Sequence, residues 1–233
     1  MFQNQNKIHI KWSSNFAYAV GLITADGCLN KDTRHISFVS KDLELIEKFK
    51  QSLSLKNHIG KAARGGTTEK KYFYINFGDK IFYQFLNSIG LTSAKSRTIK
   101  SVKIPKQYFP DFLRGLFDGD GTFFSSWDKR WKHSLVYKVS FCSASKNFMV
   151  WLKNEIDSLY GLHGSFHKGA GVERIEYTKN DSARLFEIMY YEPGLLFLNR
   201  KYNKIKNMLE FNRRLKIIVP AIYNFRLVAT MPR

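Results

Sequence analysis

The segment Gly21-Leu-Ile-Thr-Ala-Asp26-Gly27 recurs 94 residues later as Gly115-Leu-Phe-Asp-Gly-Asp120-Gly121. Both copies follow apolar stretches that suit a helix. Further along, residues 36–42 (Ile-Ser-Phe-Val-Ser-Lys-Asp) match residues 139–145 (Val-Ser-Phe-Cys-Ser-Ala-Ser), and apolar residues at helical spacing follow each. The tripeptide 94–96 (Ala-Lys-Ser) then corresponds to 200–202 (Arg-Lys-Tyr). Four matched segments in the same order indicate a duplicated unit.

Within one unit the apolar period changes from helical to alternating and back. The predicted elements of the first unit are a helix over 15–24, a hairpin over 27–41 turning near 31–33, a helix that Asp42 caps and that runs to Leu53, a hairpin over 59–77 turning at Gly65-Gly66, and a helix over 79–89. We therefore expect an α+β fold of two pseudo-symmetric αββαββα units, residues 1–104 and 105–233, with helices covering one face of each antiparallel sheet.

The charge of the chain indicates a polyanionic partner. Its 233 residues carry 38 Lys and Arg against 19 Asp and Glu, a net charge of +19. Residues 1–104 hold 17 basic and 7 acidic side chains, and residues 105–233 hold 21 and 12. Because the excess is shared equally, we expect both halves to contact the polyanion.

Other classes of protein fit the sequence poorly. No apolar run is long enough for a membrane span, and residues 1–11 do not resemble a signal peptide. Two cysteines exclude a disulfide framework, and they give no zinc-ligand spacing with six scattered histidines. We expect a reducing, intracellular compartment, either the cytoplasm for a bacterial or phage-encoded protein or an organelle matrix.

The uncovered face of each predicted sheet carries polar and basic side chains. Alternation puts Tyr72, Tyr74 and Asn76 on one face, and places Arg174, Glu176 and Thr178 likewise. A two-stranded ribbon with such a face fits the major groove of duplex DNA, although an ordinary solvated sheet face would look the same. The predicted DNA contacts are Arg34, His35, Ser37, Arg64, Tyr72, Tyr74, Asn76, Arg130, Lys138, Ser140, His167, Arg174, Glu176 and Thr178.

Asp26 and Asp120 each fall at the C-terminal end of a predicted helix, where the helix dipole disfavours a carboxylate. A divalent cation such as Mg²⁺, bound between carboxylates and phosphates, would offset this repeated penalty. Gly21 and Gly115 lie inside the same helices at a cost of about 1 kcal/mol each, which close helix–helix packing would repay. That packing would bring the two acids together. The alternative is that each Asp-Gly is only a turn after a helix.

These segments resemble the two motifs of the LAGLIDADG homing endonucleases in their single-chain, two-motif form. The first motif covers residues 19–27 and the second 113–121, and the likeness extends over residues 13–212. The family's metal-binding acid corresponds to Asp26 and Asp120. Thr24 departs from the family, which often has Asp there, at a position that does not bind metal.

The resemblance implies a saddle of two sheets that straddles a long duplex DNA site, with the motif helices at the interface. It also implies a monomer that cuts both strands with Mg²⁺ and leaves short 3′ overhangs, although Mn²⁺ or Ca²⁺ could occupy the metal site. The expected activity is metal-dependent phosphodiester hydrolysis. A free-standing or intron-encoded gene is expected, because the chain shows no protein-splicing framework.

The family also places basic residues around each cleavage centre. Lys95 and Lys201 hold matching positions after the third helix of each unit, where a lysine would orient water or stabilise charge on the phosphate. Lys41 matches a second basic position whose counterpart is Ala144, so unequal cutting of the two strands is expected. The alternative for each lysine is a phosphate contact without a catalytic role.

Two further interpretations stay open. Residues 200–216 hold seven basic residues and the single acid Glu210, which suits either a helix on the DNA backbone or a solvated basic face. The rival function is a protein that kept the fold for RNA splicing or transcriptional regulation and does not cut. Both acids argue against that rival, and residues 217–233 give no signal.

Overall fold

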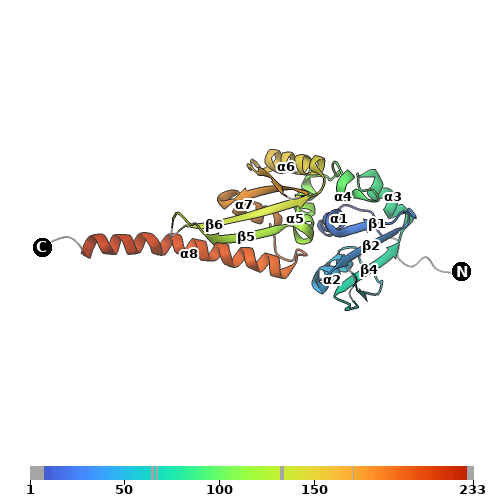
Figure 1. Ribbon diagram of the computed structural model, residues 1–233, viewed down its shortest axis with the longest axis horizontal. Coiled ribbons are helices and arrows are strands. Elements are labelled where there is room, and N and C mark those ends of the chain that lie inside the picture. Colours follow the sequence, from blue (N-terminus) through green and yellow to red (C-terminus); the bar gives the residue numbers. More distant parts are fainter. Residues whose placement is uncertain (1–7, 64–65, 67, 132–133, 170, 230–233) are drawn as a thin grey trace.

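Each half of the chain repeats the order helix, two strands, helix, two strands, helix (Figure 1). The computed structural model describes residues 8–63, 66, 68–131, 134–169 and 171–229, with side chains as far as residue 215 in the last helix. The first half contains α1 (Ser14–Asp26), β1 (Gly27–Leu29), β2 (His35–Ser40), α2 (Leu43–Ser52), β3 (Gly60–Ala62), β4 (Tyr72–Gly78) and α3 (Lys80–Ser88).

The second half contains α5 (Phe109–Asp120), β5 (Thr122–Trp127), β6 (Leu135–Ser143), α6 (Lys146–Tyr160), β7 (Ser165–Gly169), β8 (Val172–Thr178) and α7 (Lys179–Met189). After the third helix of each half comes one more helix, α4 (Lys95–Thr98) or α8 (Asn199–Ala229). The predicted α+β class with two αββαββα units is confirmed. The boundary that we expect before Pro105 falls between α4 and the 3-10 turn Lys106–Tyr108.

Short polar side chains fix where the helices begin. At each of these N-caps a side-chain oxygen accepts a hydrogen bond from a backbone N–H in the first turn. The caps are Ser13, Asp42, Asp79 and Ser145. Asp42 caps the helix predicted for it, and Ser145 caps its counterpart in the second half, so the last positions of the matched segments 36–42 and 139–145 have the same role.

The strands form two four-stranded antiparallel sheets, in the orders β1-β2-β4-β3 and β5-β6-β8-β7. One face of each sheet is buried under its helices: Ile36, Phe38, Val139 and Ile175 are fully buried. The Phe38 ring stacks on Phe49 of α2 with centroids 4.3 Å apart. The other face carries the alternate residues, as the sequence predicts, and none of the described helices lies across it (Figure 1). Of the predicted turn at Gly65-Gly66, Gly65 lies outside the described residues.

Helices α1 and α5 pack directly against each other between the two sheets (Figure 1). A methyl group on Gly21 would lie 2.2 Å from the carbonyl oxygen of Phe112, and one on Gly115 would lie 2.1 Å from that of Tyr18. Real Cβ atoms do not approach backbone so closely, so only glycine fits at either position. The two glycines therefore set the separation of the motif helices and join the two units.

Helix α8 begins beside the motif helices, runs along β5 and continues past the second sheet (Figure 1). The ammonium of Lys204 donates to the carbonyl oxygen of Phe123 at 3.0 Å, and the rings of Phe211 and Trp127 meet with centroids 6.2 Å apart. These contacts cover β5, the outer strand of its sheet, and so protect an edge that would otherwise be open to pairing.

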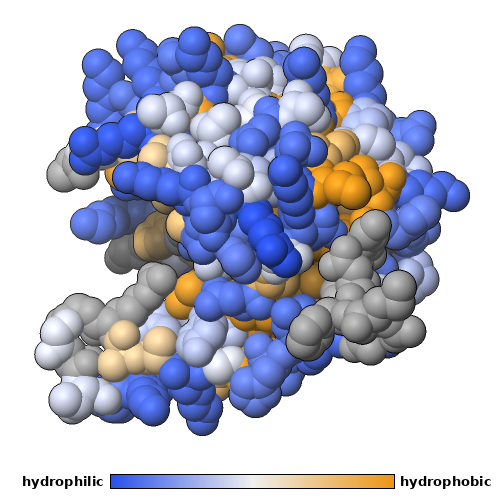
Figure 2. Space-filling view, turned by 90° about the vertical axis from the view of Figure 1, so that its right-hand side faces the viewer, coloured by the Kyte–Doolittle hydropathy of each residue, from blue (hydrophilic) through white to orange (hydrophobic). Residues whose placement is uncertain are grey.

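The exterior of the N-terminal unit is mostly hydrophilic. Figure 2 shows the end of the molecule that carries the N-terminal unit, where hydrophilic residues cover most of the face and hydrophobic ones form small patches. Within the part of the chain that the structure describes, none of the helices combines the length and apolarity that a membrane crossing requires.

The glycine contact gives a stability prediction. Gly115→Ala should lower the free energy of unfolding by about 1 to 3 kcal/mol, because the helices must separate to admit the methyl group. Gly169→Ala in β7 is the control, since its nearest neighbouring atom would be 3.6 Å away. Urea denaturation of both variants measures the difference, and equal stabilities would show that the helices separate without cost.

Candidate active site

The two motif acids leave adjoining helix ends. Asp26 is the last residue of α1 and Asp120 is the last residue of α5. The helices are still in contact there, since a methyl group on Gly119 would lie 2.4 Å from the Cβ of Ala25 and 3.4 Å from Oδ2 of Asp26. Both carboxylates remain accessible to solvent. The structure thus brings the two predicted acids to one point, between the sheets.

The electrostatics of this point disfavour two negative charges. Partial burial and then the charge of Asp120 raise the pKa of Asp26 from its ordinary value of 3.8 to about 6. Burial also raises the pKa of Asp120. The positive charges of Lys201 and Lys95 act against both shifts. Without a bound cation, the ionised forms of Asp26 and Asp120 are therefore disfavoured.

A hard divalent cation fits this donor set. Each acid offers accessible carboxylate oxygens, and their mutual repulsion would be relieved by a positive ion. Among the described residues, no three His, Cys, Asp or Glu side chains converge to form a complete cage. Asp26 and Asp120 would therefore supply only part of a coordination shell and leave the other positions to water or substrate oxygens, as Mg²⁺ sites often do.

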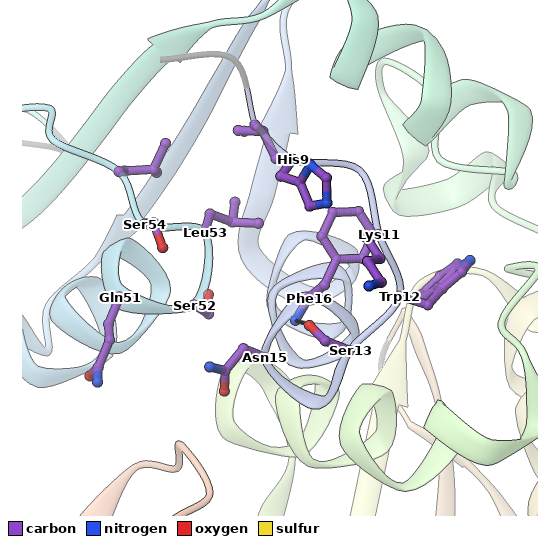
Figure 3. Close-up of a pocket in the computed structure, with 12 residues that line it drawn as sticks. His9, Lys11, Trp12, Ser13, Asn15, Phe16, Gln51, Ser52, Leu53 and Ser54 are labelled. Atoms are coloured by element: carbon purple, nitrogen blue, oxygen red, sulfur yellow. Dashed lines mark hydrogen bonds between the residues drawn. The ribbon is translucent and has the colours of Figure 1, made fainter. Parts of the chain in front are cut away.

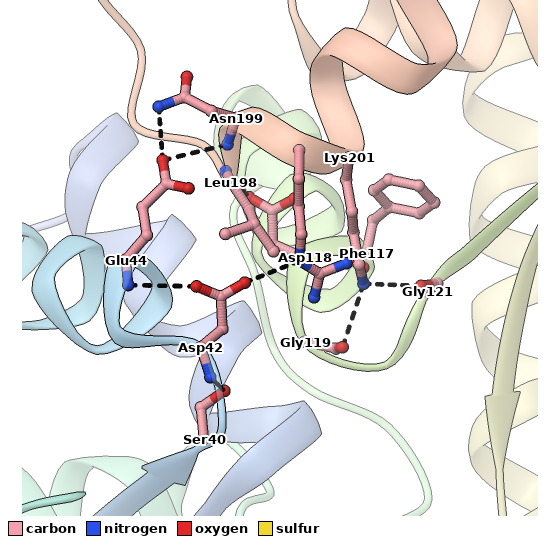
Figure 4. Close-up of polar contacts among 11 residues, drawn as sticks. Ser40, Asp42, Glu44, Phe117, Asp118, Gly119, Gly121, Leu198, Asn199 and Lys201 are labelled. Carbon is pink, nitrogen blue, oxygen red and sulfur yellow. Dashed lines mark hydrogen bonds and ion pairs between the residues drawn. The ribbon is translucent and has the colours of Figure 1, made fainter. Parts of the chain in front are cut away.

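Lys201 lies beneath the end of the second motif helix (Figure 4). Its ammonium donates to the carbonyl oxygens of Phe117 at 2.6 Å, Gly121 at 2.7 Å and Gly119 at 3.2 Å. Burial lowers its pKa from 10.5 to about 8. Its positive charge lies at the negative pole of α5, where it partly offsets the penalty that Asp120 incurs there.

Lys95 holds the matching place beneath the first motif helix. Its buried ammonium donates to the carbonyl oxygen of Gly27, directly after Asp26, and burial lowers its pKa. Both lysines that we predicted to act in catalysis therefore lie close to the acids. Their hydrogen bonds go to backbone carbonyls, so these lysines also stabilise the ends of the motif helices.

The asymmetry at the second basic position is visible in the structure. Lys41 is exposed, and its ammonium lies 5.2 Å from the centre of the Tyr72 ring. Ala144, its counterpart, lines a small pocket of about 90 Å³ together with Lys95 and Asp120. This pocket joins a lysine of the first half to the acid of the second, so the lysines are not confined to their own halves.

A buried polar network that we did not predict supports the site. Asp118, two residues before Asp120, accepts hydrogen bonds at 2.8 Å from the hydroxyl of Tyr18 in α1 and from the backbone N–H of Leu198. Burial raises the pKa of Asp118 to about 6. These contacts hold the start of α8, and with it Lys201, against both motif helices. The available signal was an acid, Asp118, at the position that Thr24 holds in the first motif.

The start of α8 is also tied to the first unit (Figure 4). The guanidinium of Arg200 lies 2.7 Å from a carboxylate oxygen of Asp42, and Asn199 donates to Glu44 from its side chain at 2.5 Å. An equivalent contact joins the end of the first unit to the second unit. Ser145, at the start of α6, donates to the carbonyl oxygen of Ile99, just after α4. Each unit thus reaches across to the cap of the other unit's second helix.

The predicted DNA-contact residues of the first sheet lie along its uncovered face or its rim. Ser37 and Asn76 are directly opposite each other in β2 and β4. His35 begins β2 and pairs with Asp32 at 2.6 Å. The remaining predicted residues are Arg34, exposed in the turn before β2, Tyr72 and Tyr74, half-buried in β4, and Arg64, which lies outside the described residues.

In the second sheet the predicted residues line a groove of about 460 Å³. Lys138, Ser140, Arg174 and Glu176 are among the residues that form it. Thr178 is exposed opposite Lys138, and His167 is exposed opposite Arg174. Arg130 is exposed in the loop after β5, where it pairs with Asp128 at 3.6 Å. Glu176 and Ser140 are buried by their neighbours, which the alternating pattern did not predict.

A separate hollow of about 470 Å³ lies between the segment before α1 and the end of α2 (Figure 3). His9, Lys11, Trp12 and Gln51 are among its lining residues. Neither motif acid lines it, so it is not part of the candidate active site.

Residues 14–90 match the family model of the LAGLIDADG-like domain. The uncharacterized protein MJ0314 of Methanocaldococcus jannaschii is 24% identical over 154 residues, which cover 64% of this chain and 56% of that protein. The chain therefore matches little more than half the length of this relative.

The solved structures share the fold at low identity. The LAGLIDADG meganuclease I-AabMI bound to uncleaved DNA superimposes with a TM-score of 0.59 at 13% identity, covering 94% of this chain and 99% of that one. The meganuclease I-SmaMI bound to uncleaveable DNA gives 0.56 at 16%, covering 87% and 94%. Full-length DUF199/WhiA from Thermatoga maritima gives 0.53 at 13%, covering 93% and 69%. The predicted resemblance to the LAGLIDADG proteins, and the fold it implies, are confirmed.

The raised pKa of Asp26 predicts how stability depends on pH. Its folded pKa of about 6 exceeds its ordinary 3.8, so ionisation destabilises the metal-free fold above pH 6, and the penalty disappears below about pH 4. Asp26→Asn should therefore raise the melting temperature in EDTA by a few degrees at neutral pH and change it little at pH 4.

Asp32→Asn is the control of opposite sign. Hydrogen bonds from His35 lower the pKa of Asp32 to about 2, so its stabilising contribution is present above pH 4 and is lost as the pH falls toward 2. Thermal melts of the wild type and both variants from pH 4 to pH 8 make the comparison. A lower melting temperature for Asp26→Asn at neutral pH would contradict the inferred repulsion.

Proposed function

We propose that this protein, with its LAGLIDADG fold, is a site-specific DNA endonuclease that hydrolyses both strands of a long duplex target. The observation that supports this most directly is the convergence of Asp26 and Asp120 at adjoining helix ends, with a lysine beneath each. The uncovered, polar sheet faces on either side would hold the duplex. A net charge of +19 would supply the phosphate contacts.

The chain's own residues supply three parts of the proposed reaction. Asp26 and Asp120 would hold Mg²⁺, which activates water and stabilises the leaving oxygen when bound; Mn²⁺ or Ca²⁺ could occupy the same position. Lys95 and Lys201 add positive charge close to where the phosphate would lie. The glycine contact fixes the spacing of the two acids, so both strands would be cut near the centre of the site. Short 3′ overhangs are part of the proposal through the resemblance to the LAGLIDADG endonucleases.

Several structural neighbours support DNA as the partner. I-AabMI, I-SmaMI and I-LtrWI are each described as bound to DNA. A variant of I-DmoI, with a TM-score of 0.50 at 16% identity, is described in complex with its target DNA in the presence of Mn. We extend these properties to this chain as part of the proposal, together with action as a monomer inside a cell and a role in intron homing.

A binding protein that does not cut is the second candidate. The similarity to DUF199/WhiA favours it, because that protein shares the fold and is not described as a meganuclease. The two acids favour the nuclease, since a protein that only binds DNA gains nothing from the repulsion between them. Incubation of the protein with a plasmid library of random inserts, with Mg²⁺ or with EDTA, separates the candidates: site-specific linear product only with Mg²⁺ supports the nuclease.

The proposal predicts that Asp26→Asn and Asp120→Asn each abolish double-strand cleavage and leave DNA affinity within about tenfold. The amide keeps the size of the side chain but loses the charge that would hold the metal. Cleavage rates and gel-shift affinities, each measured on the selected target, provide the two readings. Wild-type cleavage by either variant would remove that acid from the site.

Lys41 and Ala144 predict unequal scission of the two strands. Lys41→Ala should slow the faster strand by about tenfold or more and bring the two rates closer together, because the centre with two basic groups loses one of them. Ala144→Lys should narrow the difference between the strands. Both residues are exposed, so folding should not change. Time courses with each strand end-labelled measure both rates, and Lys80→Ala, at an exposed position of α3, is the control. Equal slowing of both strands by Lys41→Ala would contradict the assignment.

A further inference from the structure

One carboxylate lies in the middle of the uncovered face of the second sheet. Glu176 in β8 is opposite Ser140 in β6 and Ser165 in β7, so it occupies one of the two inner strands. It is only 7% exposed, although its face of the sheet carries no helix layer. Neighbouring side chains, and not the core, bury it.

Three potentially cationic side chains surround Glu176. The ammonium of Lys138 donates to both carboxylate oxygens, at 2.9 and 2.8 Å. The guanidinium of Arg174, two residues earlier on the same strand, donates at 3.2 Å, and a ring nitrogen of His167 lies 3.5 Å away. Lys138 also lies over the Phe124 ring, 5.6 Å from its centre. Glu176 is thus the common partner of the basic groups on this face.

The first sheet has no such arrangement at the matching position. Ser37 in β2 corresponds to Ser140 in β6. Ser37 is opposite Asn76 in β4, and Ser140 is opposite Glu176 in β8. Asn76 is exposed and neutral, and its neighbour Tyr74 stands where the second sheet has Arg174. The carboxylate and its basic partners therefore belong to one half of the pseudo-symmetric surface.

A carboxylate on a surface that faces DNA needs compensation, because it repels phosphates. Burial acts to raise the pKa of Glu176, but hydrogen bonds from Lys138 and Arg174 outweigh it and hold the pKa below its usual range. The carboxylate consequently stays ionised and its partners stay oriented toward it. Lys138 and Arg174 together carry two positive charges against the one negative charge of Glu176, so the cluster still attracts DNA.

The hydrogen-bond donors left over point to the chemistry of the partner. Arg174 has five N–H groups and the carboxylate engages one nitrogen, whereas Lys138 has three and uses two. The free donors border the groove of about 460 Å³. In the major groove guanine offers two adjacent acceptors, N7 and O6, and a fixed arginine fork matches them.

We propose that Glu176 is a positioning residue that holds Arg174 and Lys138 so that the second sheet selects guanine at the base pairs beneath this cluster. The inference rests on the proposed function only in placing duplex DNA across the sheets. Arginine and lysine side chains lose considerable rotamer freedom when they bind a base. If Glu176 holds both side chains in place before DNA binds, they can donate only to acceptors at matching positions. Binding then depends on the sequence of the DNA.

Glu176→Gln tests the proposal, because it removes the charge and keeps the shape. A library of randomised duplex DNA is bound in EDTA, so that no cleavage intervenes, and the bound fraction is sequenced. The wild type should prefer guanine by roughly tenfold or more at one or two adjacent positions in one half-site. The variant should lose that preference to within about twofold while its affinity for the pooled library stays within a few-fold of the wild type.

Four further variants make the result specific. Glu173→Gln removes the same charge from the same strand outside the cluster and should leave the profile unchanged. Arg174→Ala should remove the same preference, and combining it with Glu176→Gln should cause no further loss if the two act together. Glu176→Asp keeps the charge and should retain part of the guanine preference. A general loss of folding caused by any substitution at this position would remove the preference from this variant as well.

The outcomes separate this inference from the nuclease proposal. A uniform change in affinity over all sequences, with the guanine preference intact in Glu176→Gln, would overturn the positioning role. A G·C preference in the wild type that Glu176→Gln removes and Arg174→Ala retains would also overturn it, by assigning the base contact to the carboxylate itself. Cleavage is assayed separately, so a wild type that selects guanine without cutting would contradict only the nuclease proposal.

Discussion

The close contact between α1 and α5 is the constraint on which the rest of this structure depends. Gly21 and Gly115 bring the two backbones to a separation that no other residue allows. Because the helices end at equivalent residues, the same contact brings Asp26 and Asp120 to one point. It also sets the two sheets on either side of that point, with both uncovered faces available to one long ligand (Figure 1). Helix packing, the acids and the binding surface are therefore consequences of a single interface.

Positive charge from elsewhere in the chain compensates for what that interface costs. Two acids at the negative ends of two helices repel each other and the helix carbonyls, and Lys95 and Lys201 donate to those carbonyls. The same balance recurs on the second sheet, where one acid is held among basic side chains. In both places, opposite charges at short range make a local violation of the usual electrostatic preferences tolerable and keep functional groups in fixed positions.

The sequence predicted what depends on local pattern and on repetition. The motif helices, the cap at Asp42, the sheet faces and the positions of Lys95 and Lys201 follow from spacing and from comparison of the two halves. Apart from the packing of the two motif helices, it did not predict contacts between residues far apart in the chain. The bonds from Tyr18 and Leu198 to Asp118 span 100 and 80 residues, and no periodicity reports them. Glu176 was placed on the correct face, but alternation says nothing of the partners that bury it.

The reciprocal contacts between the units affect how such a protein could be recombined. Arg200 and Asn199 from the end of the second unit hold the start of α2 in the first, and Ser145 at the start of α6 in the second unit holds the segment after α4 in the first. If one half were replaced by the corresponding half of a relative, the new half would bring its own motif glycine. It would lose the partners of the two segments that cross between the units, the start of α8 and the segment after α4. The two motif helices and both crossing segments therefore have to be kept together. New combinations of the two sheet surfaces are best made by substituting strand residues within one chain that keeps all of these contacts.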